Sequence, residues 1–264
     1  MPSRERIYRS EAVILRRQDL GEADRLLTIF TPDHGKLRVV AKGVRRLRSR
    51  KAGHLEPLTR ARLMLARGRN LDVITQAEAV ELFTSLRGDL ERLGQAFYVV
   101  ELLDRFTVEE GETQRLYDLL LKTLGRLAAE DEGSVVVRFF ELRLLELVGY
   151  RPELFRCLGC GKELKPQDQF FSVDMGGILC PNCGAGRKHA HPISLAALKV
   201  LRYYQRNAYA VAATAKIRSK VHAELDRLLE SYLTYLLEKR LHTPDFLRRV
   251  NELATKAYKA ETTT

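Results

Sequence analysis

Four cysteines are the residues of this chain whose type and spacing most directly suggest chemistry. The pattern C-x2-C-x19-C-x2-C is formed by Cys157, Cys160, Cys180 and Cys183. Each pair is followed by a glycine, Gly161 or Gly184, so the chain can turn tightly enough to direct two sulfurs at one ion. Thiolates in a tetrahedral array suit Zn2+, and this spacing is typical of a four-cysteine zinc ribbon. An iron–sulfur centre, or cysteines without metal, are the alternatives.

The expected role of this metal is structural. Four protein ligands would complete the coordination sphere and leave no position for an activated water. A zinc deaminase is excluded because His222 and Glu224 form H-x-E without the required P-C-x-x-C. His189 and His191 follow the last cysteine closely and could in principle replace a cysteine as ligand, but two complete C-x2-C pairs favour the four cysteines. We therefore expect one structural Zn2+ per chain as the cofactor.

A basic stretch in the N-terminal third is the second candidate site. No acidic residue lies between Asp33 and Glu56. The basic residues of this stretch are Lys36, Arg38, Lys42, Arg45, Arg46, Arg48, Arg50 and Lys51. Clustered cations on a short segment with glycines can neutralise backbone phosphates without reading bases. A merely solvated basic face is the alternative.

Composition points to the same kind of partner. The 264 residues include 45 Lys/Arg and 34 Asp/Glu. Residues 1–80 hold 18 Lys/Arg against 9 Asp/Glu, whereas residues 81–264 hold 27 Lys/Arg against 25 Asp/Glu. A polyanion should therefore bind the N-terminal third first. No apolar run reaches the length of a membrane span and no signal peptide precedes Tyr8, so a cytoplasmic location, without a membrane partner, is expected.

The sequence lacks the common catalytic motifs. No phosphate-binding loop is present, because Gly35-Lys36 is followed by leucine, and G-x-S-x-G and H-E-x-x-H are absent. Asp19, Glu22 and Asp24 could form a metal-dependent nuclease site, but turn and solvated-edge residues are the simpler interpretation. The chain is therefore expected not to be an enzyme and to have no small-molecule substrate.

The periodicity of hydrophobic residues predicts an α+β protein. Period two from residue 8 to 82 predicts five strands, at Tyr8–Arg17, Leu26–Thr31, Lys36–Ala41, Ala61–Ala66 and Leu71–Ala79. This pattern fits an OB-fold β-barrel, with an SH3-like barrel as the alternative. No aromatic residue lies between Thr31 and Leu82 to stack bases. Contacts with single or double strands should therefore be mainly electrostatic.

Helical periodicity follows the barrel and predicts a bundle domain. One stripe is formed by Leu90, Leu93, Phe97, Val100 and Leu103, and a second by Leu116, Leu120, Leu124 and Leu127. A buried central helix is expected at 135–148, and a last helix from Thr243 to Leu253. The predicted domains are an OB-fold nucleic-acid-binding domain at 1–82, the first part of the helical domain at 83–154, the zinc ribbon insertion at 155–190 and the second helical part at 191–264.

Three stretches together resemble the bacterial recombination mediator family RecO. They are Gly21-Glu22-x-Asp24 with Thr31-x-x-x-Gly35-Lys36 and Ala41-Lys42-Gly43-x-Arg45; Leu144-Leu145 through Gly149-Tyr150-x-Pro152 into Cys157-x-x-Cys160-Gly161; and Gly176-Gly177-x-x-Cys180-x-x-Cys183. The match follows the chain in order. The position of the zinc ribbon after the central helix adds weight, since the ribbon alone occurs in many families.

The resemblance implies a DNA repair and recombination role without catalysis. RecO proteins bind single- and double-stranded DNA, anneal complementary strands and, with RecR, help RecA displace the single-strand-binding protein SSB in the RecF pathway, close to the nucleoid. By position, the resemblance places DNA contacts at Lys36, Arg38, Lys42, Arg45 and Arg46, while the last three basic residues match in character only. An RNA-binding protein of translation or RNA handling is the alternative.

Overall fold

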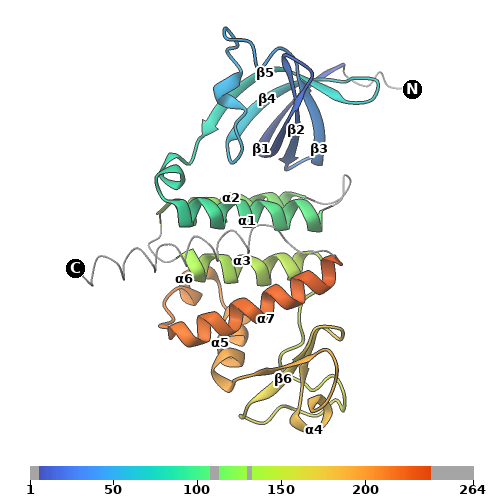
Figure 1. Ribbon diagram of the computed structural model, residues 1–264, viewed down its shortest axis with the longest axis vertical. Helices are drawn as coiled ribbons and strands as arrows, with labels where there is room; N and C mark the ends of the chain where they lie inside the picture. Colours follow the sequence, from blue (N-terminus) through green and yellow to red (C-terminus); the bar gives the residue numbers. More distant parts are fainter. Residues whose placement is uncertain (1–5, 108–112, 130–132, 239–264) are drawn as a thin grey trace, which may run out of the picture. The chain divides into compact units, whose positions relative to one another are not determined.

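A computed structural model describes residues 6–107, 113–129 and 133–238 (Figure 1). The chain forms two compact units, residues 1–129 and residues 130–264. The helix predicted from Thr243 to Leu253 lies outside the described residues. No helix in the described part of the chain is long and apolar enough to cross a membrane.

The first unit begins with a closed five-stranded barrel, which confirms the predicted fold (Figure 1). Its strands are β1 Ile7–Leu20, β2 Asp24–Thr31, β3 Gly35–Ala41, β4 Arg60–Ala66 and β5 Asp72–Glu81. They pair in the order β1-β2-β3-β5-β4, and β1 pairs with both β2 and β4. All pairs are antiparallel except β3 with β5, which aligns Val39 with Asp72. This is the five-stranded Greek-key arrangement of the OB fold.

The barrel core follows from the alternation of the strands. Inward positions such as Ala12 and Ile14 on β1, Leu27 and Ile29 on β2, and Leu63 and Leu65 on β4 are fully or almost fully buried. Successive side chains of a strand point to opposite faces, so the positions between them face outward or toward the helices. The core therefore combines the β-branched residues that favour strands, such as Ile14 and Ile29, with leucine and alanine side chains that fill the interior.

Two helices, α1 Leu90–Phe106 and α2 Gln114–Ala129, complete the first unit after the short η2 Thr84–Gly88. The Asp89 side chain accepts hydrogen bonds from two backbone N–H groups at the start of α1, as an N-cap does. Thr113 Oγ1 donates to the carbonyl groups of Thr31 at 3.2 Å and Pro32 at 2.9 Å. The start of α2 is thus fixed to the turn between β2 and β3.

The hydrophobic stripe predicted for α1 is only partly buried. Val100 and Leu103 lie in the core, but Leu90 is 56% exposed and Phe97 is 39% exposed. The helix instead buries residues between the predicted positions, such as Tyr98 and Val99, Leu102 and Ala96. The stripe predicted for α2 is buried as expected.

The second unit combines several helices with a small sheet (Figure 1). Its elements are α3 Gly133–Leu147, β6 Gln169–Ser172, β7 Gly177–Leu179, α4 Pro181–Gly184, β8 Ala190–Ile193, α5 Leu195–Arg206, α6 Tyr209–Ala212 and α7 Ser219–Leu237. The sheet has the order β7-β6-β8 and is antiparallel. The central helix α3 is buried on most sides, as its composition predicts.

Polar contacts join the helices of the second unit. Arg138 on α3 pairs with the fully buried Glu141 at 2.7 Å and with Asp226 on α7 at 3.3 Å. Arg143 donates to the carbonyl of Asn207 at 2.7 Å, just beyond the end of α5, where cations stabilise a helix. Glu224 on α7 accepts from the backbone N–H of Ser194 at 2.6 Å, just before the start of α5. Both ends of α5 are therefore held by neighbouring helices.

The boundary between the two compact units does not coincide with a predicted domain boundary. Because the boundary falls after residue 129, α1 and α2 belong with the barrel. The division into domains at residues 82, 154 and 190 stays a prediction about sequence modules.

Candidate metal centre and nucleic-acid interface

The four cysteines come together in the second unit. The sulfurs of Cys157, Cys160, Cys180 and Cys183 all lie within 4.8 Å of one another. Zn–S distances of about 2.3 Å in a tetrahedron correspond to sulfur separations of about 3.8 Å. The cluster thus needs only small side-chain adjustments to surround one ion. Among the described residues, no histidine belongs to the cluster.

Two tight turns present the sulfurs. In the first, the Gly161 N–H donates to the Cys157 carbonyl at 2.8 Å, and Gly161 has a φ of 72°, which favours glycine. In the second, the N–H groups of Cys183 and Gly184 donate to the Cys180 carbonyl at 3.0 and 2.9 Å. Cys180 follows β7 directly, so the pairing of β7 with β6 positions the second turn.

Gly159 allows the two turns to approach each other. A Cβ at this position would lie 2.9 Å from Cys183 Cβ and 3.1 Å from its sulfur. We predict that Gly159→Ala weakens metal binding roughly tenfold, because a displaced ligand or supporting group typically costs tenfold or more in affinity. Competition with a chromophoric chelator measures this. Gly125→Ala is the control, since a Cβ there meets nothing within 4 Å; equal metal affinity in both variants would contradict the prediction.

The cysteine pKa values differ widely within the cluster. Burial raises the pKa of Cys157, but backbone N–H groups of Cys180, Cys160 and Gly159 directed at its sulfur outweigh this and lower it to about 6. The pKa of Cys183 is raised to about 12 by its hydrogen bond with Cys180, by burial and by the charge of Cys157. One thiolate therefore forms readily, whereas four can form together only around a positive ion.

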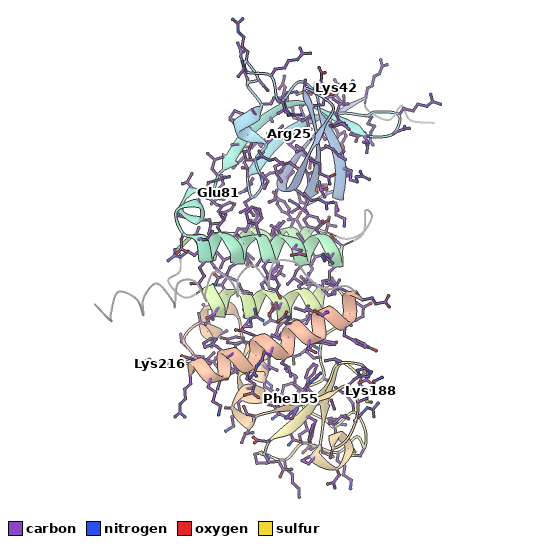
Figure 2. All side chains as sticks on the ribbon, in the orientation of Figure 1. Arg25, Lys42, Glu81, Phe155, Lys188 and Lys216 are labelled. Atoms are coloured by element: carbon purple, nitrogen blue, oxygen red, sulfur yellow. The ribbon has the colours of Figure 1, made fainter. Side chains whose placement is uncertain are left out.

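The basic stretch forms nearly all of β3 and the loop that follows it. Arg38, Lys42, Arg45, Arg46, Arg48 and Arg50 are exposed, whereas Lys36 and Lys51 are half-buried. We call residues 42–51 the basic loop. Lys42, at its start, lies at the barrel end from which the loop leaves (Figure 2).

Three of the eight cations already have partners inside the protein. The Lys36 ammonium group contacts the Asp104 carboxylate at 3.1 Å, which ties β3 to α1. Lys51 donates to the carbonyl groups of Lys42 at 3.2 Å and Ile74 at 3.0 Å, and burial lowers its pKa. Arg45 donates to the Gly21 carbonyl at 2.9 Å and pairs with Asp19 at 3.4 Å.

The remaining five cations have no carboxylate partner among the described residues. They are Arg38, Lys42, Arg46, Arg48 and Arg50. Glu56, the acid that ends the acid-free stretch, pairs instead with Arg17 and with Arg25 at 3.2 Å. These five side chains can therefore bind an anion without first breaking an internal ion pair.

Two of the three acidic residues considered for a nuclease site have structural roles, and the third, Glu22, is exposed. Asp24 accepts the Gly43 N–H at 2.7 Å and so fixes the start of the basic loop. Asp19 pairs with Arg25 and Arg45, both at 3.4 Å. In the described part of the chain, these carboxylates do not converge with a third ligand on one point.

In the described ranges of the chain, no open aromatic platform accompanies the basic loop. Phe30 is fully buried, and its ring lies 6.5 Å from that of Tyr117. Tyr8 is half-buried; Arg67 lies over its ring at 4.9 Å and His34 packs against it edge-on at 5.0 Å. Neither ring is free to stack a base.

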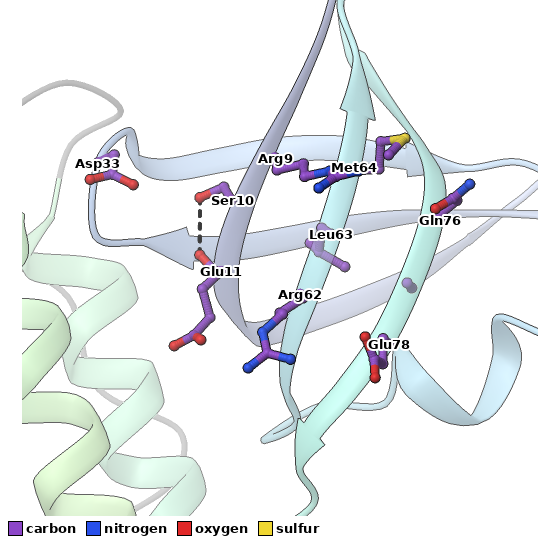
Figure 3. A pocket seen from close by; sticks show the side chains of 10 residues that line it. Arg9, Ser10, Glu11, Asp33, Arg62, Leu63, Met64, Gln76 and Glu78 are labelled. Carbon is purple, nitrogen blue, oxygen red and sulfur yellow. Dashed lines mark hydrogen bonds between the residues drawn. The ribbon is translucent and has the colours of Figure 1, made fainter.

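A separate cavity of about 560 Å³ lies over β1, β4 and β5 (Figure 3). In the strand register, Arg62 stands between Glu11 and Glu78. Arg9 adds a second cation to this cavity and Asp33 a third acid. Because positively and negatively charged side chains both line this cavity, it is a poorer phosphate site than the basic loop.

Comparison with known proteins gives the family. The family model described as Recombination protein O N terminal matches residues 5–83, and Recombination protein O C terminal matches residues 87–245. Relatives named DNA repair protein RecO include one from Roseiflexus sp., 46% identical over 250 residues, covering 95% of this chain and 88% of the relative. Another, from Desulforudis audaxviator, is 40% identical over 243 residues, covering 92% and 97%.

A third relative of the same name, from Desulforamulus reducens, is 38% identical over 245 residues, covering 93% of this chain and 95% of the relative. Both halves of the chain, the barrel and the part with the four cysteines, are thus matched in one order. This supports a function in DNA repair and recombination rather than in translation or RNA handling. The chain belongs to the RecO family of DNA repair proteins.

Proposed function

We propose that this chain is a recombination mediator that binds single- and double-stranded DNA, anneals complementary strands and, with RecR, promotes RecA loading on SSB-coated DNA in the RecF pathway. The observation that carries the proposal is a group of five exposed cations on a barrel of the OB type, for which the described residues offer no carboxylate partner. Family membership supports the choice of DNA as the polyanion.

The chemistry of annealing follows from these cations. Two complementary strands repel each other through their phosphates. Side chains that bind phosphates lower this repulsion and leave the base edges free to pair. No open aromatic platform lies near the basic loop in the part of the chain that the structure describes, and this agrees with the role, because bases stacked firmly on rings would leave slowly for a partner strand. No step requires ATP or a catalytic group, so we propose that the protein is not an enzyme.

The four cysteines supply the second part of the proposal. We propose that they hold one Zn2+ per chain, since four thiols at this spacing are the donor set that zinc prefers. The ion would link the turn at Cys157 to the turn at Cys180 and stabilise the second unit. The cytoplasm, close to the nucleoid, is the proposed location, where thiols remain reduced for metal binding.

An annealing assay tests the proposed activity. Complementary labelled strands are coated with SSB and mixed with the protein, with and without RecR. We expect the protein alone to speed duplex formation at least about tenfold at low salt, because phosphate neutralisation removes the repulsion between strands. RecA-coated strand should then form on SSB-coated DNA only when RecR is also present.

Two comparisons make this assay decisive. RNA strands of identical sequence provide the control for a role in RNA handling, and incubation of labelled DNA with Mg2+ provides the control for nuclease activity. Duplex formation at the uncatalysed rate, or RNA annealed faster than DNA, would refute the proposal. Cleavage of the labelled strand would show that the protein is an enzyme.

A further inference from the structure

The apex of the basic loop carries an apolar side chain. Leu47 has a relative exposure of 107%, whereas Leu20 and Leu82, two other exposed leucines of this unit, reach 43% and 40%. The N–H of Ser49 donates to the carbonyl of Arg46 at 2.9 Å. Residues 46–49 therefore form a hydrogen-bonded turn, with Leu47 and Arg48 at its two central positions.

The base of the loop is fixed to the barrel, so the apex is held away from it. Val44 is 1% exposed and packs in the barrel core. The N–H of Arg45 donates to the Ala23 carbonyl at 2.9 Å, and that of Gly43 to Asp24. On the other side, Lys51 closes the loop by its bonds to Lys42 and Ile74. Leu47 is thus presented to solvent by a defined turn on an anchored base.

The surroundings of Leu47 indicate what it contacts. Arg46, Arg48 and Arg50 are exposed and have no carboxylate partner among the described residues. If the flanking arginines bind phosphates, a side chain between them is held close to the same strand, and leucine is among the residues that insert between base steps in protein–DNA complexes. A basic loop with one apolar residue also fits an anionic membrane surface. Membership of a DNA repair family favours the nucleic acid.

We propose that Leu47 inserts between adjacent bases of a strand whose phosphates are bound by the flanking arginines. This inference rests on the proposed DNA binding and extends it. Insertion separates two stacked bases, and this costs least where the bases are unpaired. The loop should therefore prefer single strands and duplex ends to intact duplex, which charge alone would not produce.

The test compares Leu47→Ser with Leu90→Ser in the full chain. Leu90 is an exposed leucine on α1, 56% exposed, and serves as the matched control. The probe is a single strand containing 2-aminopurine, whose fluorescence rises when its neighbours unstack. We expect Leu47→Ser to weaken binding about fivefold and to abolish the fluorescence rise while leaving the salt dependence unchanged, since no phosphate contact is lost. Leu47→Met should restore both readouts.

The outcomes separate this inference from the proposed function. If the unaltered protein binds the strand with a steep salt dependence, but Leu47→Ser matches it in affinity and fluorescence, insertion is refuted and DNA binding stands. If the unaltered protein does not bind DNA, the proposed function itself fails. Loss of binding to phosphatidylglycerol vesicles in Leu47→Ser, with unchanged DNA binding, would assign the leucine to a membrane surface and overturn the inference.

Discussion

Cys180→Ser should lose the metal and destabilise the second unit. Zinc content is expected to fall from one ion per chain to nearly none, because three thiolates and a hydroxyl are a much poorer donor set for zinc. Structural zinc contributes about 10–16 kcal/mol of apparent binding free energy in small zinc peptides. A loss of at least about 3 kcal/mol in the free energy of unfolding is therefore expected. Elemental analysis and thermal unfolding measure the two effects.

The control for this experiment is His191→Ala. His191 lies close to the ribbon in sequence and contacts Ser231 at 3.4 Å, but it is not part of the cysteine cluster. It should keep one zinc and unfold as the unaltered protein does. A Cys180→Ser protein that loses zinc but keeps its unfolding temperature would show that the ion does not stabilise the unit, and one that keeps zinc would contradict the ligand assignment.

The cysteine cluster could be predicted because its geometry is mostly local. Each C-x2-C pair lies on one turn, so the sequence spacing alone brings two sulfurs together. The meeting of the two turns depends on the β6–β7 pair and on Gly159, whose missing side chain leaves room for Cys183. The sequence contained both features, but only the folded chain shows that they act together.

The barrel strands were predicted to within a few residues for a similar reason. The alternation of apolar and polar residues identifies a strand from that strand's own residues. For example, β3 begins at Gly35, one residue before the predicted start at Lys36. The end of β1 was missed: it extends to Leu20 instead of Arg17, because its last residues are exposed and pair with β2 without adding to the core. The barrel closes through the parallel pairing of β3 with β5. This pairing joins residues that are far apart in the sequence, so no local sequence pattern predicts it.

The helix α1 and the basic stretch show where sequence patterns are insufficient. A helical stripe indicates that one face is buried, but not which neighbours cover it, and Phe97 stays partly exposed. Similarly, charge counts treat all cations alike, whereas Lys36 is tied to Asp104, 68 residues further along the chain. The sequence pattern also does not predict that Leu47 is exposed, because a single leucine among arginines is equally compatible with burial.

These placements change which residues an interface experiment should replace. Arg45 was predicted as a DNA contact together with Arg46, but it pairs with Asp19 and the Gly21 carbonyl, so its loss would also disturb the loop. Arg46, Arg48 and Arg50 have no such bonds among the described residues and can be changed without removing a structural contact.

The triple variant Arg46→Gln, Arg48→Gln, Arg50→Gln should bind single-stranded DNA much more weakly. Each lost phosphate contact lowers the slope of log K against log salt by about 0.7, so three contacts lower it by about 2. This corresponds to a loss of affinity of roughly 50-fold at about 0.15 M salt, similar for every sequence because phosphates carry no sequence information. Titrations of fluorescent oligonucleotides at several salt concentrations measure both quantities.

A control with the same change in net charge separates local contacts from overall attraction. Lys216, Arg218 and Lys220 are exposed residues at and before the start of α7, and their replacement by Gln also removes three positive charges. If affinity depended only on net charge, both triple variants would lose it equally, and the assignment of the basic loop would be wrong. We expect the α7 variant to keep most of the salt slope, because the slope counts phosphate contacts and these three cations are not part of the basic loop.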